Sequence, residues 1–151
     1  MRAMFVAALL AATAFALPAA AQPGFDGSWA VNLTCPDDAG GAKGFSYDFN
    51  GRIDGGLLHA RHGIHGEPGF ITLDGQVSPN GDANLIAEGL SPSPNASPDN
   101  TDAGIPYTHP VTAHFEARRG NGSWTTTREC DFTFRKLADP STDPEAGPAE
   151  N

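Results

Sequence analysis

The stretch Gly27-Ser-Trp-Ala-Val-Asn-Leu-Thr-Cys35 alternates large apolar side chains with small or polar ones along its whole length. Trp29, Val31, Leu33 and Cys35 fall on one face, and the residues between them fall on the other. Because successive side chains of a β-strand point to opposite faces, this period of two is typical of a strand with one buried face. The stretch therefore predicts an amphipathic strand that turns Cys35 toward the core.

Five later segments repeat this alternation, and short runs rich in Gly, Asn and Asp separate several of them. The inward-facing sets are Phe45, Tyr47 and Phe49; Ile71, Leu73, Gly75 and Val77; Ala83, Leu85 and Ala87; Val111, Ala113, Phe115 and Ala117; and Trp124, Thr126, Arg128, Cys130, Phe132 and Phe134. The expected turns are Asn50-Gly51, Asp54-Gly55-Gly56, Asn80-Gly81 and Gly120-Asn121-Gly122.

This pattern predicts an all-β fold, since no window of the sequence has the periodicity of an amphipathic helix. Sequential strands joined by short turns favour an antiparallel up-and-down meander. Closing that meander into a small barrel of about seven or eight strands would leave no exposed strand edge. A two-sheet β-sandwich is the alternative arrangement.

The N-terminus has the features of a secretory signal peptide. Arg2 supplies a positive charge, residues 6–17 form a short apolar run, and Ala19-Ala20-Ala21 matches the cleavage rule of signal peptidase. We expect cleavage between Ala21 and Gln22, and export to the periplasm or the medium. The apolar run is shorter than the roughly 20 residues that a membrane-spanning helix needs.

The rest of the chain divides into a folded domain and a tail. Residues 22–137 contain all the alternating segments and form the predicted β-barrel domain. Residues 138–151 are acidic and contain no aliphatic side chain larger than Ala, so we expect this tail to be disordered. A Pro-rich and polar segment between Ser91 and Pro106 is too long for a tight turn and predicts a long connection between two strands.

The two cysteines, Cys35 and Cys130, both lie in the folded domain. In an exported protein, two cysteines allow a single intramolecular pairing. Both belong to inward-facing sets, as a bridge between the first and last strands requires. Closing so long a loop would stabilise the fold by about 4 kcal/mol through the entropy of the unfolded chain. The alternative is two free, buried thiols.

Gly27-Ser-Trp29 at the first strand, together with Arg128 near the last, resembles the calycin pattern of lipocalin-like barrels. This resemblance implies that Trp29 packs beneath the Arg128 guanidinium. It gives the pair either a barrel-closing or a ligand-binding role. The predicted core is shorter than that of a typical lipocalin, and no flanking helix is evident in the sequence.

Four longer segments resemble a group of small secreted proteins of alpha-proteobacteria. These segments are Phe25 to Cys35, Gly66 to Gly75, Gly104-Ile-Pro-Tyr107 and Arg128-Glu-Cys-Asp-Phe132. The resemblance spans most of the folded domain and implies the fold and export, but no activity.

His59, His62 and His65 form an H-x-x-H-x-x-H motif, and Glu67 follows closely. On a strand, a spacing of three places neighbouring histidines on opposite faces. No cysteine completes a zinc-type ligand set, so we expect solvated histidines in a Gly-rich loop and no metal site. His109 and His114 flank the start of a later strand and receive the same interpretation.

Composition and motifs exclude several classes of function. The 151 residues include 18 Asp and Glu against 9 Lys and Arg, giving a net charge of −9 that disfavours nucleic-acid binding. The sequence contains no Gly-x-Ser-x-Gly nucleophile elbow, no Gly-x-Gly-x-x-Gly fingerprint and no Walker sequence. We therefore expect neither an enzyme nor a bound cofactor.

The remaining prediction is a binding module for a small apolar ligand. Its candidate ligand-binding or barrel-closing residues are Trp29, Phe45, Tyr47, Phe115, Trp124 and Arg128. The alternative is a protein-interaction module, such as an inhibitor of a secreted protease or an envelope accessory protein. Residues 91–106 would then make the contact, since long loops commonly carry function. A small disulfide-pinned barrel of this kind is similar in outline to bacterial metalloprotease inhibitors.

Overall fold

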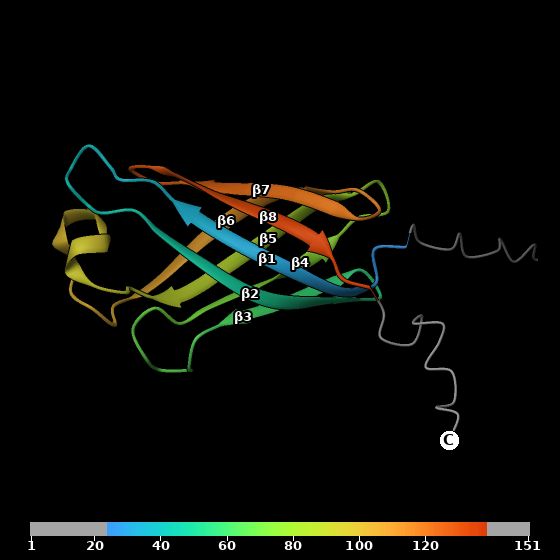
Figure 1. Cartoon of the computed structure of the whole chain (residues 1–151), viewed down its shortest axis with the longest axis horizontal. Coiled ribbons are helices and arrows are strands. Elements are labelled where there is room, and N and C mark those ends of the chain that lie inside the picture. The colour runs from blue at the N-terminus through green and yellow to red at the C-terminus, as the bar shows by residue number, and fades with distance from the viewer. Residues whose placement is uncertain (1–23, 139–151) are drawn as a thin grey trace, which may run out of the picture.

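The computed structural model describes residues 24–138, which form a closed barrel of antiparallel strands in chain order (Figure 1). Each strand pairs with its neighbours in sequence, and β1 also pairs with β8 to close the cylinder. The strands are β1 Gly27–Cys35, β2 Phe45–Asp54, β3 Leu57–His62, β4 Ile71–Val77, β5 Asp82–Leu90, β6 Pro106–Phe115, β7 Arg119–Thr125 and β8 Glu129–Lys136. Two short 3₁₀ turns, η1 Pro94–Ala96 and η2 Pro98–Asn100, lie between β5 and β6.

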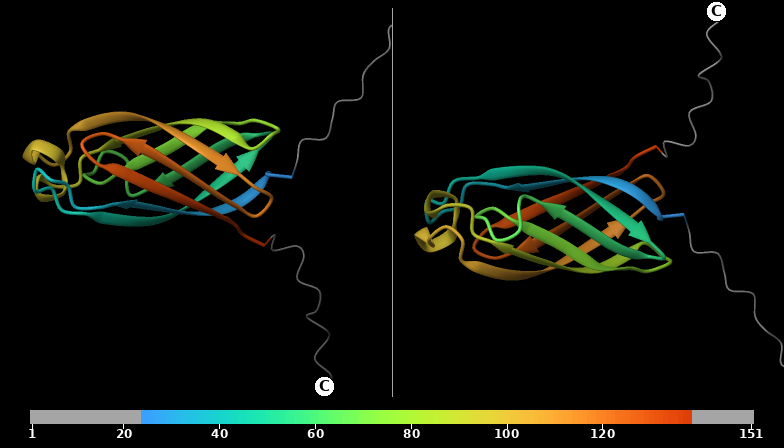
Figure 2. Two further views of the ribbon diagram at one scale, coloured as in Figure 1. Left: turned by 90° about the horizontal axis from the view of Figure 1, so that it is seen from above. Right: turned by 90° about the horizontal axis from the view of Figure 1, so that it is seen from below.

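This architecture confirms the predicted all-β up-and-down barrel, with eight strands, and excludes the β-sandwich. The strands run obliquely to the long axis of the barrel, as closure requires (Figure 2). The predicted signal peptide and residues 139–151 of the predicted tail lie outside the described residues. Among residues 24–138, no helix is long and apolar enough to cross a membrane.

The barrel interior is filled with the side chains that the alternation placed there. In β1, Trp29, Val31, Leu33 and Cys35 are each no more than 2% exposed, and the intervening residues face outward. Phe132 from β8 is fully buried beside them. Burial of each large apolar side chain stabilises the fold by about 1.5–3 kcal/mol.

A disulfide between Cys35 and Cys130 pins the seam where β1 meets β8, as the sequence predicts. Thr34 lies opposite Asp131 in the register, so the two cysteines come next in the same antiparallel ladder. Their Cα atoms are 4.3 Å apart, close to the about 4.5 Å expected of a narrow antiparallel pair. The bridge therefore joins directly neighbouring strands.

The segment predicted as one strand from Trp124 to Phe134 is in fact two strands. β7 ends at Thr125 and β8 begins at Glu129, and the Thr126 N–H donates to the Arg128 carbonyl at 2.9 Å across the turn between them. Trp124 and Cys130 consequently lie opposite each other on neighbouring strands. The period of two continues without a break from β7 through the turn into β8. The sequence pattern alone therefore does not reveal that the chain reverses direction there.

Two predicted turns are also wrong, although those at Gly55-Gly56 and Asn80-Gly81 are confirmed. Gly51 continues β2, where it lies opposite both Trp29 and Ala60. A Cβ atom on Gly51 would lie 2.7 Å from the Ala60 Cβ, so only glycine lets the neighbouring strand approach this closely.

The same physical reason explains the run predicted as a turn at residues 120–122, which instead belongs to β7. Gly122 lies opposite Ala113 and Phe132, and a Cβ on it would lie 2.7 Å from the Ala113 Cβ. These glycines allow a neighbouring strand to approach closely and do not reverse the chain.

Candidate functional site

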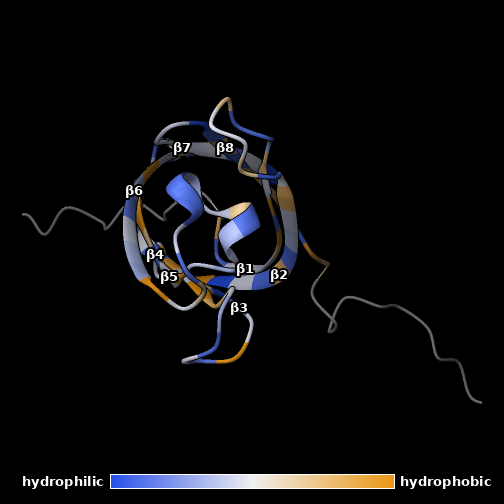
Figure 3. Ribbon diagram, turned by 90° about the vertical axis from the view of Figure 1, so that its left-hand side faces the viewer, coloured by the Kyte–Doolittle hydropathy of each residue, from blue (hydrophilic) through white to orange (hydrophobic). Residues whose placement is uncertain are grey.

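The two ends of the barrel differ in how they are closed. At the end where β1 begins, Trp29 and Phe115 fill the interior, with ring centroids 5.3 Å apart in an edge-to-face arrangement. The Trp29 indole N–H donates to the Phe25 carbonyl at 2.8 Å. At the end where β1 finishes, residues 91–106 fold across the opening, and we call this segment the lid. Figure 3 looks into this end and shows the two 3₁₀ turns in front of the barrel opening.

The base of the lid is held by Ser91, which is only 5% exposed. The Ser91 N–H donates to the Ile105 carbonyl at 2.9 Å, and the Gly104 N–H donates to the Ser91 carbonyl at 2.8 Å. The Ser91 hydroxyl donates to the Asp102 carbonyl and accepts from the Ile105 N–H. These bonds extend the β5–β6 pairing into the lid and bring its two ends together.

The outer part of the lid is attached to the connection between β1 and β2. The Lys43 N–H donates to the Asn95 carbonyl at 2.6 Å. The Arg128 Nη2 donates to the Ala96 carbonyl, also at 2.6 Å. The lid is thus bonded at its base and at its outer part.

A cavity of about 330 Å³ lies between the lid and the barrel mouth. This volume is near the lower end of the about 300–1,000 Å³ that is usual for small-molecule sites. The barrel contributes Cys35, Phe45, Tyr107, His109, Trp124, Thr126, Arg128 and Cys130, and the lid contributes Ser91, Pro92, Ala96, Ser97, Pro98, Asp99, Thr101, Ile105 and Pro106. The lid therefore makes about half of the cavity wall.

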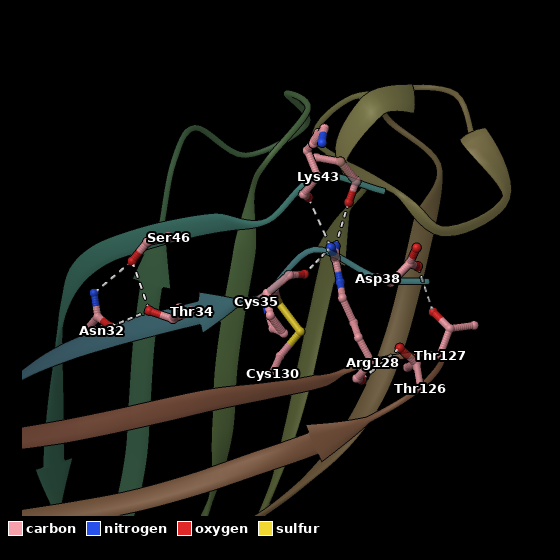
Figure 4. The surroundings of a disulfide bond; sticks show 12 residues. Asn32, Thr34, Cys35, Asp38, Lys43, Ser46, Thr126, Thr127, Arg128 and Cys130 are labelled. Atoms are coloured by element: carbon pink, nitrogen blue, oxygen red, sulfur yellow. Dashed lines mark hydrogen bonds between the residues drawn. A yellow bond between two sulfur atoms is a disulfide. The ribbon is translucent and has the colours of Figure 1, made fainter. Parts of the chain in front are cut away.

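Arg128 is the buried charged residue of this cavity, with 8% exposure. Its Nη1 donates to the carbonyls of Pro36 at 2.8 Å and Lys43 at 3.0 Å. Its guanidinium carbon lies 5.3 Å from the centre of the Phe45 ring, a favourable cation–π arrangement. Figure 4 shows the side chain rising beside the disulfide toward the carbonyl oxygens of the β1–β2 connection.

The arrangement of Trp29 beneath Arg128, which the calycin resemblance implies, is therefore wrong for this barrel. Trp29 lies near the start of β1, opposite Lys136 and Gly51, whereas Arg128 lies beyond the end of β1 that carries Cys35. Six residues of strand, roughly 20 Å, separate those two levels. The antiparallel register is the cause, because the start of β1 meets the end of β8 and not the turn that precedes it.

The six candidate residues from the sequence consequently lie in three different parts of the barrel. Phe45, Trp124 and Arg128 line the cavity. Trp29 and Phe115 are fully buried at the far end of the barrel and close it. Tyr47 packs inside the barrel wall, where its ring stacks on His62 with 4.1 Å between centroids.

Two aromatic residues of the cavity, Tyr107 and His109, were missed as site residues. They stack on each other with ring centroids 5.1 Å apart, and His109 lies 5.1 Å from Trp124. Both share the inward parity of Val111 in β6, so extending that alternation toward the N-terminus would have found them. Two prolines in this strand, at positions 106 and 110, obscured the signal.

Burial keeps both of these side chains uncharged near neutral pH. It raises the pKa of Tyr107 well above its ordinary value, and the nearby Tyr47 raises it further. Burial also lowers the pKa of His109. The aromatic wall is therefore neutral, and the charges of the cavity come from the buried Arg128 and the exposed Asp99.

The histidine motif does not form one cluster. His59 and His62 lie in β3, which the sequence did not predict, and their alternate faces are confirmed: His59 bonds to Asp74 outside, and His62 stacks on Tyr47 inside. His114 faces outward and pairs with Asp82 at 2.8 Å. Within residues 24–138, no group of three or more His, Cys, Asp or Glu side chains is placed to hold a metal ion.

No protein-family model, curated protein or solved structure matches this chain. Any function therefore has to be argued from the cavity itself.

Proposed function

We propose that the protein is exported and binds a small, mainly apolar ligand in the cavity beneath the lid. The carrying observation is that cavity: about 330 Å³ walled by Phe45, Tyr107 and Trp124 and covered by an ordered segment. An apolar, concave site with a few polar groups is the usual form of a small-molecule site. The site offers binding and no catalytic constellation that we recognise, so we propose a binding protein and not an enzyme.

Within residues 24–138, large side chains pack the middle and the far end of the barrel interior. Leu33, Leu73 and Phe132 are each fully buried at mid-barrel, and Trp29 closes the far end. An eight-stranded barrel is narrow enough to be filled by its own side chains. We therefore place the ligand at the mouth.

The alternative of a protein-interaction module acting through residues 91–106 receives less support. The hydrogen bonds of Ser91, Asn95 and Ala96 tie this segment to the barrel, so it does not project as a free arm. A protease inhibitor or an envelope accessory protein remains a prediction from the sequence.

Tryptophan fluorescence tests the proposal, because the chain has two tryptophans and one of them lines the cavity. Trp29→Phe leaves Trp124 as the reporter, and Trp124→Phe leaves Trp29 as the matched control at the far end. We expect a neutral brominated probe, 4-(4-bromophenyl)butanamide, to quench the fluorescence of the Trp29→Phe variant in a saturable way. The control variant should show only the weak linear quenching of collisions. Equal behaviour of the two variants would argue against a ligand site at the mouth.

Export is tested separately. We expect the protein recovered from a periplasmic fraction to begin at Gln22, as measured by intact mass. Recovery of the full-length chain in the cytoplasm alone would contradict this part of the proposal.

A further inference from the structure

The chemistry of Arg128 identifies the class of ligand more closely, on the condition that the proposed binding function is correct. A guanidinium carries five N–H donors in one plane. The bonds to Pro36, Lys43 and Ala96 use both hydrogens of Nη1 and one hydrogen of Nη2. Among the described residues, no hydrogen bond uses the Nε–H or the second Nη2–H. No fully buried side-chain nitrogen there lacks a partner, so the Nε–H is open to solvent although the residue is only 8% exposed.

Among the described residues, no carboxylate forms an ion pair with this buried charge. None of the ion pairs within residues 24–138 includes Arg128. The carboxylate of Asp37 is exposed and that of Asp38 is half-buried, and they are bonded chiefly to the backbone N–H groups of Gly44 and Ala42. Arg128 lowers the pKa of both carboxyls only as the smallest of the causes, so they act on its charge without forming an ion pair. The direct partners of the guanidinium are three carbonyl dipoles and one aromatic ring, and dipoles compensate a buried charge less well than a bonded anion does.

The aromatic part of the cavity wall favours a flat ring. Tyr107, His109 and Trp124 form a cluster of three rings, each in contact with the other two, with centroid separations of 5.1–6.2 Å. Aromatic partners that stack or meet edge-to-face with such rings gain attraction beyond simple burial. The volume of about 330 Å³ lies near the lower end of the usual range of about 300–1,000 Å³ for small-molecule sites, so it suits a compact ligand.

We propose that the cavity binds a compact aromatic carboxylate, whose ring packs against Trp124 and whose carboxylate accepts hydrogen bonds from Arg128. Asp99 on the lid also lines the cavity, and its negative charge would repel the carboxylate of such a ligand. Asp99 is exposed, however, so water screens its repulsion much more than it screens the attraction of the buried guanidinium. The balance favours an anion.

The test compares 4-(4-bromophenyl)butanoate with its neutral amide, which has the same shape. Both are titrated into the Trp29→Phe protein and followed by quenching of Trp124 and by calorimetry. We expect the carboxylate to bind at least about tenfold more tightly than the amide, a difference of about 1.4 kcal/mol. Arg128→Met should remove this preference, and Arg135→Met, which changes an exposed arginine of β8, should leave it unchanged.

Arg128→Met also removes three bonds that hold the lid and the β1–β2 connection, so far-UV circular dichroism must first show that the variant folds. Asp99→Asn provides a second test that leaves those bonds intact. It should strengthen binding of the carboxylate by up to about threefold and leave binding of the amide unchanged.

The outcomes separate the two proposals. Equal affinity for the carboxylate and the amide, or a preference that persists in Arg128→Met, would overturn the assignment of the ligand class and leave the binding function standing. Saturable binding of neither probe would overturn the binding function, and this inference with it.

Discussion

Removal of the Cys35–Cys130 bridge should cost this barrel a large and calculable part of its stability. The two cysteines are 95 residues apart, and in the chain-entropy model a loop of that length contributes about 4.5 kcal/mol by restricting the unfolded chain. For a domain of this size, 1 kcal/mol corresponds to about 4 °C of melting temperature. We therefore expect Cys35→Ala/Cys130→Ala to melt about 15–20 °C below the oxidised protein.

Urea and thermal unfolding of the double variant, the oxidised protein and the reduced protein measure this effect. The reduced protein is the matched control, because it keeps both sulfur atoms and loses only the bond between them. Addition of reductant should therefore destabilise the wild-type chain and leave the double variant unchanged. The urea m-value should rise without the bridge, since an uncrosslinked unfolded chain exposes more surface. A loss of less than about 1 kcal/mol would refute the reasoning, because it would mean that the bridge restricts the unfolded chain far less than its loop length implies.

Three other outcomes follow from the interior of the barrel. Gly51→Val should destabilise the fold by about 1–3 kcal/mol in urea unfolding, because its side chain would meet Ala60 at the level of Trp29. The raised pKa of Tyr107 means that the unfolded chain loses its phenol proton first, so stability should fall as the pH rises above about 10. Tyr107→Phe should remove that component of the fall in high-pH unfolding curves. The lowered pKa of His109 means that the unfolded chain gains the proton first, so stability should decline as the pH falls through about 6.5. NMR titration of the imidazole should give a pKa below that value, and His109→Gln should flatten this part of the stability curve.

The candidate site could be predicted only in part. Phe45, Trp124 and Arg128 were recognised as inward-facing aromatic and charged residues, and all three line the cavity. The sequence predicts the lid only as a long connection between two strands. A Pro-rich, polar segment carries no local pattern that indicates which part of the molecule it covers. Ser91 illustrates the difficulty: its buried hydrogen bonds join positions 11 and 14 residues apart.

Arg128 shows why a local motif can identify a residue and misplace it. Its inward position followed correctly from the alternation, but its partner was expected to be Trp29, at the other end of the barrel. The register of β1 against β8, with Trp29 opposite Lys136, decides which side chains share a level. A register depends on contacts between strands about a hundred residues apart in sequence, and no single segment contains that information.

Local polarity by itself determined the class of this fold. A period of two requires strands with one buried face, short turns require neighbouring strands to be antiparallel, and two inward-facing cysteines allow a single pairing. Tertiary structure alone decided which glycines turn the chain and which sit within strands, as Gly51 does opposite Trp29. It also decided that residues 91–106 fold over the mouth and enclose a cavity. These features depend on which residues lie opposite each other on neighbouring strands. Only the closed barrel brings those pairs of residues together.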